Sequence, residues 1–460
     1  MRLIAYMKPY AHWVIFALLL VLGLTAFDLY RPMLVGDAID TFGANGGYDV
    51  IIATAIKYAV VLALSFAFNV AQTWILQKTG QNIILQMRKD LYRHIQSLGS
   101  RYFDITPVGK LVTRVTNDVE ALNEMYSGIL VQLFRNIVKI VGLAGVMLVL
   151  DVRLAAISFV LMPLVIGLTV LCQKIARNIY RLYRTRLTDI NTFLSEHLSG
   201  MKIIQIFGRQ ERKFEEFHDK NTKLYKAFYR EMLMYAVFRP LIYILSILSL
   251  MIVLWFGSKN VFDEIISVGT LYIFSNYIRS FFDPIQELAE QFSTLQSSIA
   301  SAEKIFTVMD EDEFIPEVEN PKQPDKITGK IEFDHVWFAY DGENYVLKDV
   351  SFVINPGEKV AFVGATGAGK SSILNLIGRY YDIQKGHIYI DGIDIRQLSK
   401  KKLRSAIGQM QQDVFIFEGD VAYNIRLNDD DITDAQVKAA AEYVNASHFI
   451  EKLPQGYHEL

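Results

Sequence analysis

The residues most clearly suited to chemistry form the pattern G-x-x-x-x-G-K-S, from Gly364 to Ser371. Gly364, Gly367 and Gly369 let the backbone wrap closely around phosphate oxygens, and the N–H groups of such a loop converge on them. The ammonium group of Lys370 can reach the terminal phosphates, and the hydroxyl of Ser371 can ligate Mg²⁺. The spacing therefore predicts a loop that binds a nucleoside triphosphate.

The flanking segments predict how this loop is held. Before it, the apolar run from Val360 to Val363 predicts a short buried strand. After it, apolar residues recur at the spacing of a helix face: Ile373, Leu374, Leu376 and Ile377. A helix that starts here directs its unpaired N–H groups and the positive end of its dipole at the loop. The alternative, a glycine-rich turn beside a surface lysine, would not require this order of strand, loop and helix.

The composition describes a chain with two unlike parts. Of the 460 residues, 52% are hydrophobic, and the long apolar runs lie before Asp310. The mean hydropathy is +0.22. A formal net charge of −2 argues against nucleic acid as a partner. The single cysteine, Cys172, cannot form a disulfide within the chain and predicts no zinc or redox site.

Six apolar segments approach the roughly 20 residues needed to cross a bilayer. They are Trp13–Val35, Ile51–Leu76, Ile129–Leu150, Leu154–Leu171, Tyr235–Phe256 and Val268–Leu288. The last segment fits least well because Asn276, Arg279 and Asp283 interrupt it. Residues 1–310 are therefore expected to form an all-α transmembrane domain of six helices.

Several charged side chains lie inside these spans, where they are costly and usually face other helices or a wet cavity. They form three close pairs along the sequence: Asp28 with Arg31, Arg135 with Lys139, and Arg279 with Asp283. These pairs are candidates for interhelical contacts or for the lining of a cavity. The alternative is that the side chains extend toward the membrane surface near helix ends.

Basic residues concentrate in two long segments between the spans, at about residues 80–128 and 174–234. The positive-inside rule places both segments, and both termini, in the cytoplasm. Apolar residues such as Leu91, Ile95 and Leu98 recur at helical spacing, which predicts that spans two to five continue far into the cytosol with a turn at each tip. We therefore expect a multi-pass integral protein of the plasma membrane, with the lipid bilayer as a partner.

Residues 311–328 are acidic and contain Pro316, Pro321 and Pro324, a composition typical of a linker. From residue 329 to residue 460, strand-like runs alternate with turn signals. The runs are Lys330–Phe338, Val346–Ile354, Lys359–Val363, His387–Ile390 and Ser405–Met410. Helices are expected at Ser371–Tyr380 and Asp434–Val444. The pattern predicts an α/β domain built around the glycine loop.

Six spans with two deep cytoplasmic loops, followed by a phosphate-loop domain, resemble a half-transporter of the ATP-binding cassette (ABC) exporter family, of the multidrug and lipid type. The segments that carry this resemblance outside the cassette domain are Pro32–Asp40, Phe103–Val119, Lys202–Glu211 and Ser301–Phe306. The resemblance covers the whole chain. It implies the type I exporter fold, in which a second half-transporter subunit, identical or different, completes a dimer.

The resemblance also implies roles for single residues. Tyr340 lies where the family has the aromatic ring that stacks on adenine, a contact that could contribute about 1–3 kcal/mol. Gln412 lies where the family has the glutamine that senses Mg²⁺ and the attacking water, although its neighbour Gln411 could take that place. ATP and Mg²⁺ are the expected cofactors. The residues expected to bind ATP are Tyr340, Gly364, Thr366, Gly367, Ala368, Gly369, Lys370, Ser371 and Ser372, and those expected to contact Mg²⁺ are Ser371 and Gln412.

Other motifs of the family do not occur among the 460 residues. In the family, the signature motif, the catalytic glutamate and the switch histidine follow the part of the cassette domain that this chain resembles. The resemblance thus implies an incomplete nucleotide-binding domain here. It further implies ATPase-coupled transport by the full-length dimer and no useful rate of hydrolysis by the 460 residues alone.

The expected function is ATP-driven export of hydrophobic or amphipathic compounds, drugs or lipids, by alternating access. The sixth span offers a polar and aromatic wall suited to such compounds, cationic and lipid-like ones included, although helix packing would explain the same residues. They are Tyr272, Asn276, Tyr277, Arg279, Phe281 and Phe282. Two alternatives stay open: a peptide exporter of the same fold, and a membrane-anchored nucleotide-dependent sensor without transport.

Overall fold

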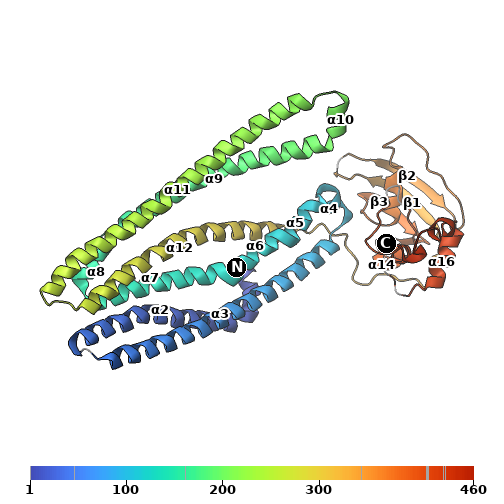
Figure 1. Cartoon of the computed structure of the whole chain (residues 1–460). Coiled ribbons are helices and arrows are strands. Elements are labelled where there is room, and N and C mark those ends of the chain that lie inside the picture. Colours follow the sequence, from blue (N-terminus) through green and yellow to red (C-terminus); the bar gives the residue numbers. More distant parts are fainter. Residues whose placement is uncertain are drawn as a thin grey trace. The chain divides into compact units, whose positions relative to one another are not determined.

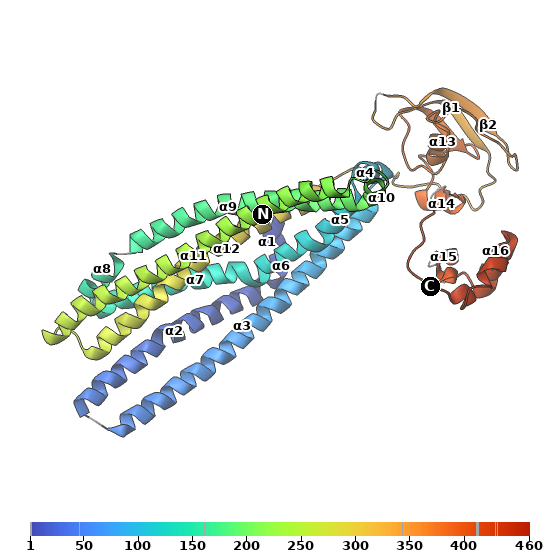
Figure 2. The same ribbon diagram turned by 45° about the horizontal axis from the view of Figure 1, so that its top comes forward.

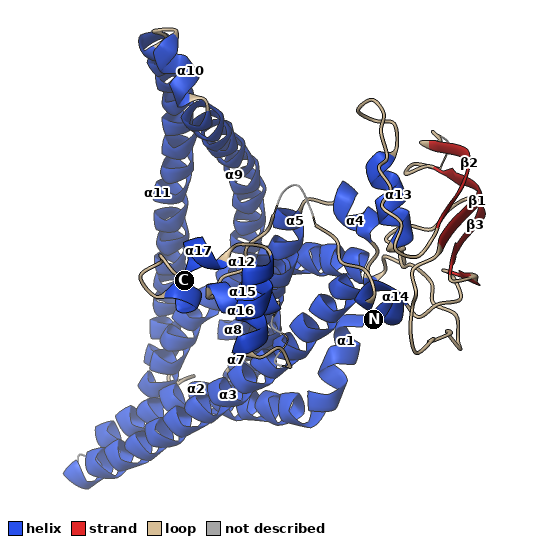
Figure 3. Cartoon of the chain, turned by 90° about the vertical axis from the view of Figure 1, so that its right-hand side faces the viewer, coloured by secondary structure: helices blue, strands red, loops and turns tan. Residues whose placement is uncertain are grey.

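The computed structural model describes residues 2–45, 47–160, 162–342, 344–410, 414–427, 429 and 431–460. The chain divides into a unit that ends at Phe314 and a unit that begins at Ile315. The first unit is helical, and all strands found in the described residues lie in the second, as the colours of Figure 3 show. An all-α domain followed by an α/β domain is therefore confirmed.

Six long helices joined by short ones make up the described part of the first unit. The chain begins with α1 (Arg2–Met7) and the 3₁₀-helix η1 (Lys8–Tyr10). The long helices are α2 (Ala11–Asn45), α3 (Tyr48–Ser97), α7 (Leu130–Leu150), α9 (Met162–Ser199), α11 (Gln210–Phe262) and α12 (Val268–Met309). The connecting elements are α4 (Ser100–Ile105), α5 (Val108–Thr113), η2 (Arg114–Asp118), α6 (Val119–Glu124), η3 (Met125–Ile129), α8 (Val152–Phe159) and α10 (Met201–Ile206).

Five helical stretches among the described residues are long and apolar enough to cross a membrane. They are Arg2–Phe42, Tyr48–Ser97, Val108–Leu150, Val152–Ser199 and Gln210–Phe262. The sixth predicted span lies in α12, a continuous helix of 42 residues that does not belong to this set of five. Its interruption by Asn276, Arg279 and Asp283 explains the lower apolarity, because charged and amide groups oppose transfer into hydrocarbon.

Several helices are far longer than a bilayer is thick. Helix α3 has 50 residues and α11 has 53, which at 1.5 Å per residue corresponds to about 75–80 Å. The hydrocarbon core measures about 30 Å, so most of each helix must extend beyond it. Short helices, α4 after α3 and α10 between α9 and α11, turn the chain at the tips. Figures 1 and 2 show α9 and α11 side by side up to α10. The predicted helical extensions are confirmed.

Among the described residues of the bundle, one apolar cluster joins α2, α3 and α7, and two larger clusters include α12. Of these two, one joins α7, α8, α9, α11 and α12 through fully buried side chains such as Met147, Val253 and Phe274. The other joins α3, α6 and α12 through side chains such as Leu91 and Ile305. Where the helices lie in lipid, close packing rather than the hydrophobic effect holds them, because lipid tails are as apolar as the side chains. Outside the bilayer, burying one large apolar side chain contributes about 1.5–3 kcal/mol.

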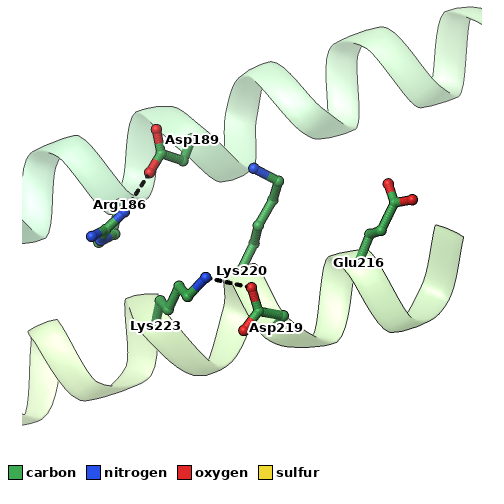
Figure 4. A pocket seen from close by; sticks show the side chains of 6 residues that line it. All are labelled: Arg186, Asp189, Glu216, Asp219, Lys220 and Lys223. Carbon is green, nitrogen blue, oxygen red and sulfur yellow. Dashed lines mark hydrogen bonds and ion pairs between the residues drawn. The ribbon is translucent and has the colours of Figure 1, made fainter.

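Charged side chains fill a small hollow of about 170 Å³ between the extensions of α9 and α11. Figure 4 shows Lys220 of α11 reaching toward α9 beside two pairs within single helices: Arg186 with Asp189 at 3.1 Å, and Lys223 with Asp219 at 2.5 Å. Exposed pairs of this kind contribute about 0–1 kcal/mol each. The hollow is therefore a solvated interface between two helices. Its charged lining does not require a bound ligand.

The second unit contains an antiparallel sheet with strand order β2-β1-β3-β4. Its strands are β1 (Ile331–Phe338), β2 (Leu347–Ile354), β3 (Lys385–Ile390) and β4 (Ile393–Asp394). Its helices are α13 (Lys370–Ile377), α14 (Lys400–Ser405), α15 (Val421–Arg426), α16 (Asp434–Tyr443), α17 (Ser447–Ile450) and the 3₁₀-helix η4 (Gly456–His458). One face of the sheet packs on α13 through Phe333, Ile388 and Leu376. Three predicted strands and both predicted helices are thereby confirmed within a few residues.

Two predicted strands are wrong. Residues 359–363 have no strand partner in the described part of the chain, and Val363 is 90% exposed. An apolar run favours a strand only where neighbouring strands supply hydrogen bonds, and the local sequence cannot show that. Ser405 ends α14, and residues 406–410 form no regular structure. Leu403 and Ile407 contact the same core, but residues four apart share one face of a helix and of a strand alike, so their spacing could not decide between the two.

Candidate functional site

The glycine loop has the backbone conformation that its sequence requires. Gly367 and Gly369 have φ angles of +88° and +85°, a region that costs other residues roughly 1–2 kcal/mol. At Gly369 a side chain would also collide with β2, because its Cβ would lie 2.7 Å from Cδ2 of Leu347. At Gly364 a Cβ would lie 3.2 Å from Cβ of Ala368. A ligand can therefore approach the loop backbone more closely at these glycines than at any residue that has a side chain.

Helix α13 begins directly after the loop, at Lys370. Its buried residues Ile373, Leu376 and Ile377 belong to the core beneath the sheet, so the helix N-terminus is fixed against that core. The Nζ atom of Lys370 donates hydrogen bonds of 2.8 Å to the carbonyl oxygens of Gly364 and Ala365. A lysine ammonium has three donors, so it can hold the loop and still contact an anion.

The structure brings Tyr340 next to the loop, although the loop begins 24 residues later in the sequence, at Gly364. The hydroxyls of Tyr340 and Ser372 share a hydrogen bond of 3.0 Å. Ser372 is buried in the first turn of α13, whereas Ser371 and the loop residues Thr366 and Ala368 are exposed. Of the ten predicted site residues, nine thus occur in one continuous region. The tenth, Gln412, lies outside the described residues, as does its neighbour Gln411.

Neighbouring rings and one amide hold Tyr340 in place. Its ring meets those of Phe338 and Tyr381 nearly edge to face, at centroid distances of 4.7 and 5.1 Å. The Gln384 side chain accepts a hydrogen bond from the backbone N–H of Ala339 at 2.8 Å and donates one to its carbonyl at 2.9 Å. Tyr340 remains 37% exposed, so part of the ring is accessible. Gln384 and Tyr381 were not predicted from the sequence because they lie more than one element away from Tyr340, and no local pattern marks them.

Two aspartates order the backbone around β3 and the turn that follows it. Asp391 accepts hydrogen bonds from the hydroxyl of Thr328 and the backbone N–H groups of Gly329 and Lys330, at 2.6–3.1 Å. Burial opposes ionisation of Asp391, but these hydrogen bonds outweigh it and lower its pKa. For Asp394, burial is likewise outweighed by bonds from Arg396 and His387, and the pKa falls to about 2. Both carboxylates are therefore charged at neutral pH. Asp391 fixes the start of β1, the strand that leads to Tyr340, and Asp394 joins β3 to Arg396.

The groups available at the loop suit phosphate. They are backbone N–H groups, one ammonium group and two hydroxyls. The described residues contain no group of three or more histidine, cysteine, aspartate or glutamate side chains that could hold a metal ion alone. A divalent cation at this loop would thus depend on hydroxyl and phosphate oxygens, as in other phosphate loops. The residues present fit a nucleoside triphosphate.

Comparisons with known proteins agree with this geometry. The family described as "ABC transporter transmembrane region" matches residues 14–285, and the family described as "ABC transporter" matches residues 347–460. A putative ABC transporter ATP-binding protein, exp8, of Streptococcus pneumoniae is 36% identical over 457 residues, 99% of this chain and 78% of that protein.

Two further relatives have more specific names. The probable multidrug resistance ABC transporter ATP-binding/permease protein YheH of Bacillus subtilis is 35% identical over 405 residues, 87% of this chain and 60% of that protein. The ATP-dependent lipid A-core flippase of Desulfotalea psychrophila is 30% identical over 449 residues, 96% of this chain and 77% of that protein. Both matches include membrane and nucleotide-binding parts. The chain therefore belongs to the ATP-binding cassette transporter family, as an ATP-binding half-transporter of the exporter type that crosses the plasma membrane several times.

Proposed function

We propose that this chain uses ATP to export hydrophobic or amphipathic compounds, drugs or lipids, as one half of a dimer that works by alternating access. The observation that carries the proposal is the presence, in one chain, of a phosphate loop and a six-helix bundle in which helices such as α3 and α11 far exceed bilayer thickness. Transport needs both, because ATP can drive a change only by favouring one of two states. A nucleotide sensor would not need such long extensions.

At the nucleotide site, we assign the phosphates to the loop from Gly364 to Ser372 and adenine to the exposed face of Tyr340. The φ angles of Gly367 and Gly369 and the position of Lys370 over the loop support this assignment. Mg²⁺ would be held by Ser371 and, if the family pattern applies, by Gln412. When bound, the cation would neutralise charge on the phosphates.

The proposal also includes the topology of the chain. Residues 1–310 form the membrane domain, residues 311–328 the linker and residues 329–460 the nucleotide-binding part. Both termini are cytoplasmic, because the basic residues concentrate between spans two and three and between spans four and five. This orientation puts the phosphate loop on the side where ATP is available. The second subunit is an identical chain or a related half-transporter.

The names of two relatives support the substrate class, since one names multidrug resistance and the other a lipid A-core flippase. Among the polar and aromatic residues of the sixth span, Tyr272, Asn276 and Tyr277 line a cavity between helices. By contrast, Phe281 and Phe282 are buried in the core of the bundle, where helix packing explains them. The cavity, and not the whole helix face, therefore supports the proposed substrate site.

The test is transport of a fluorescent hydrophobic dye into inverted membrane vesicles that contain the protein expressed from its complete coding sequence. We expect ATP-dependent uptake that Lys370→Ala reduces to the level measured without ATP. The matched control is Lys401→Ala, which changes an exposed lysine on α14 away from the loop and should transport normally. Equal uptake by the wild type and Lys370→Ala would remove ATP-driven export. ATPase activity that no dye stimulates would favour a sensor, and stimulation by peptides alone would favour a peptide exporter.

A further inference from the structure

A polar cavity of about 410 Å³ lies inside the helical bundle, between α2, α3, α7 and α12. Its polar lining consists mainly of Asp28, Arg31, Arg135, Lys139, Tyr272 and Asn276. Aliphatic side chains, among them Leu29 and Leu143, complete the wall. Two pairs that are separate in the sequence, Asp28 with Arg31 and Arg135 with Lys139, thus belong to one site. Arg279 of α12 is exposed and does not line it.

The charges in this cavity do not balance. Asp28 is the only carboxylate among the described residues that line it, and it pairs with both Arg31 and Arg135, the latter at 3.4 Å. Three cations against one carboxylate leave an excess of two positive charges. The Nε atom of Arg31 is buried and makes no hydrogen bond within the described part of the chain. The cavity therefore has more donors and more positive charge than its own residues can use.

Lys139 is the cation with the least compensation. It is half-buried, and no hydrogen bond or ion pair joins it to another described residue. The nearby carboxylates on α12, Asp283 and Glu287, do not line the cavity. Glu287 accepts a hydrogen bond of 2.9 Å from Asn136 instead. A cation inside a membrane span costs about 2.5–3.5 kcal/mol or more, and since no described side chain pairs with Lys139, its presence there points to a ligand.

From this geometry we infer that the cavity binds the anionic end of an amphipathic molecule, a phosphate or carboxylate headgroup attached to an apolar chain. The inference rests on the proposed export function and names the substrate class. Arginine side chains present paired donors that match phosphate and carboxylate oxygens, and Lys139 adds a point charge. The aliphatic wall and the surrounding bilayer accept the chain. A cationic amphiphile would meet the excess positive charge and bind weakly.

The test measures binding without ATP, to the protein in nanodiscs of neutral phosphatidylcholine at low salt, where charge screening is weak. The probes are a dodecyl phosphate, a dodecyl alcohol and a dodecyl trimethylammonium compound, each with the same terminal fluorophore, and anisotropy gives each Kd. We expect the phosphate to bind about tenfold more tightly than the ammonium probe. Lys139→Gln should weaken the phosphate probe about tenfold and leave the alcohol within about twofold.

Two variants serve as controls, and a third can replace Lys139→Gln. Arg279→Gln removes a cation from α12 outside the cavity and should change none of the three Kd values. Lys139→Arg keeps the charge and should keep the preference. If Lys139→Gln does not fold, Arg135→Gln replaces it, because Asp28 then keeps Arg31 as its partner.

Equal Kd values for the phosphate and ammonium probes would overturn the inference, and so would an equal loss in Arg279→Gln. Competition by inorganic phosphate at the probe concentration would show a site for the free ion and not for an amphiphile. Because no ATP is present, failure of ATP-driven transport would leave this result intact. Conversely, equal binding of the charged probes would overturn this inference and leave the dye-transport result intact, so the failures of the two proposals can be told apart.

Discussion

Replacing Gly369 with alanine should destabilise the nucleotide-binding unit far more than the same change at Gly367. Both residues have left-handed backbones, with φ of +85° and +88°, so each alanine costs roughly 1–2 kcal/mol of backbone strain. Only at Gly369 does the new Cβ also meet β2, at 2.7 Å from Leu347 and 3.2 Å from Val346, whereas nothing lies within 4 Å at Gly367. Overpacking a core in this way costs about 1–3 kcal/mol more.

Hydrogen–deuterium exchange of peptides from β1, β2 and α13, without nucleotide, measures the local loss of stability in each variant. Since each 1.4 kcal/mol is about a tenfold change in the equilibrium, Gly367→Ala should speed exchange of protected amides about 5- to 30-fold. Gly369→Ala should speed the exchange of these amides by at least a further factor of about five relative to Gly367→Ala. Equal losses at the two positions would refute the reasoning, because backbone strain alone would then account for both.

Three further predictions concern the same unit. Tyr340→Phe should keep ATP affinity within about threefold because the ring remains, whereas Tyr340→Ala should lower it by about 1–3 kcal/mol; titration with ATP by calorimetry decides, and equal effects would contradict ring stacking. Arg379 is only 2% exposed and pairs with Asp382 at 2.9 Å. Its replacement by methionine should lower the free energy of unfolding by about 3–5 kcal/mol, because the acceptors of the guanidinium group are left unpaired; urea unfolding of this variant and of Arg379→Lys checks this. Because the pKa of Asp394 is lowered from 3.8 to about 2, its contribution of about 1–2 kcal/mol, after allowance for solvent screening, is present above pH 4 and lost as the pH falls toward 2. Asp394→Asn should thus differ from the wild type in thermal unfolding at pH 6 and resemble it near pH 2, and a constant difference across that range would argue against the linkage.

The parts of this protein that sequence analysis predicted best depend on local patterns. The loop from Gly364 to Ser371 is recognisable because each residue type answers a requirement of phosphate binding at a fixed offset. The long helices were predictable because apolar residues at helical spacing continue past the end of each span. Such signals need no knowledge of what packs against the segment.

The errors and omissions share one physical origin. The run at 359–363 is apolar, but whether it becomes a strand depends on partners elsewhere in the chain. Gln384 could not be connected with Ala339, since 45 residues separate the two. The pairs Asp28–Arg31 and Arg135–Lys139 looked independent until the contact between Asp28 and Arg135 joined them.

By itself, then, the amino-acid order determined the glycine loop, five apolar stretches long enough to cross a membrane and the long helices that continue past them, because these follow from spacing within one segment. The tertiary structure decided where Tyr340 meets the loop, which glycine faces a packed wall and what sign of charge dominates the cavity inside the bundle. Those properties are sums over side chains contributed by different helices and strands, and only the folded chain brings them within interaction distance.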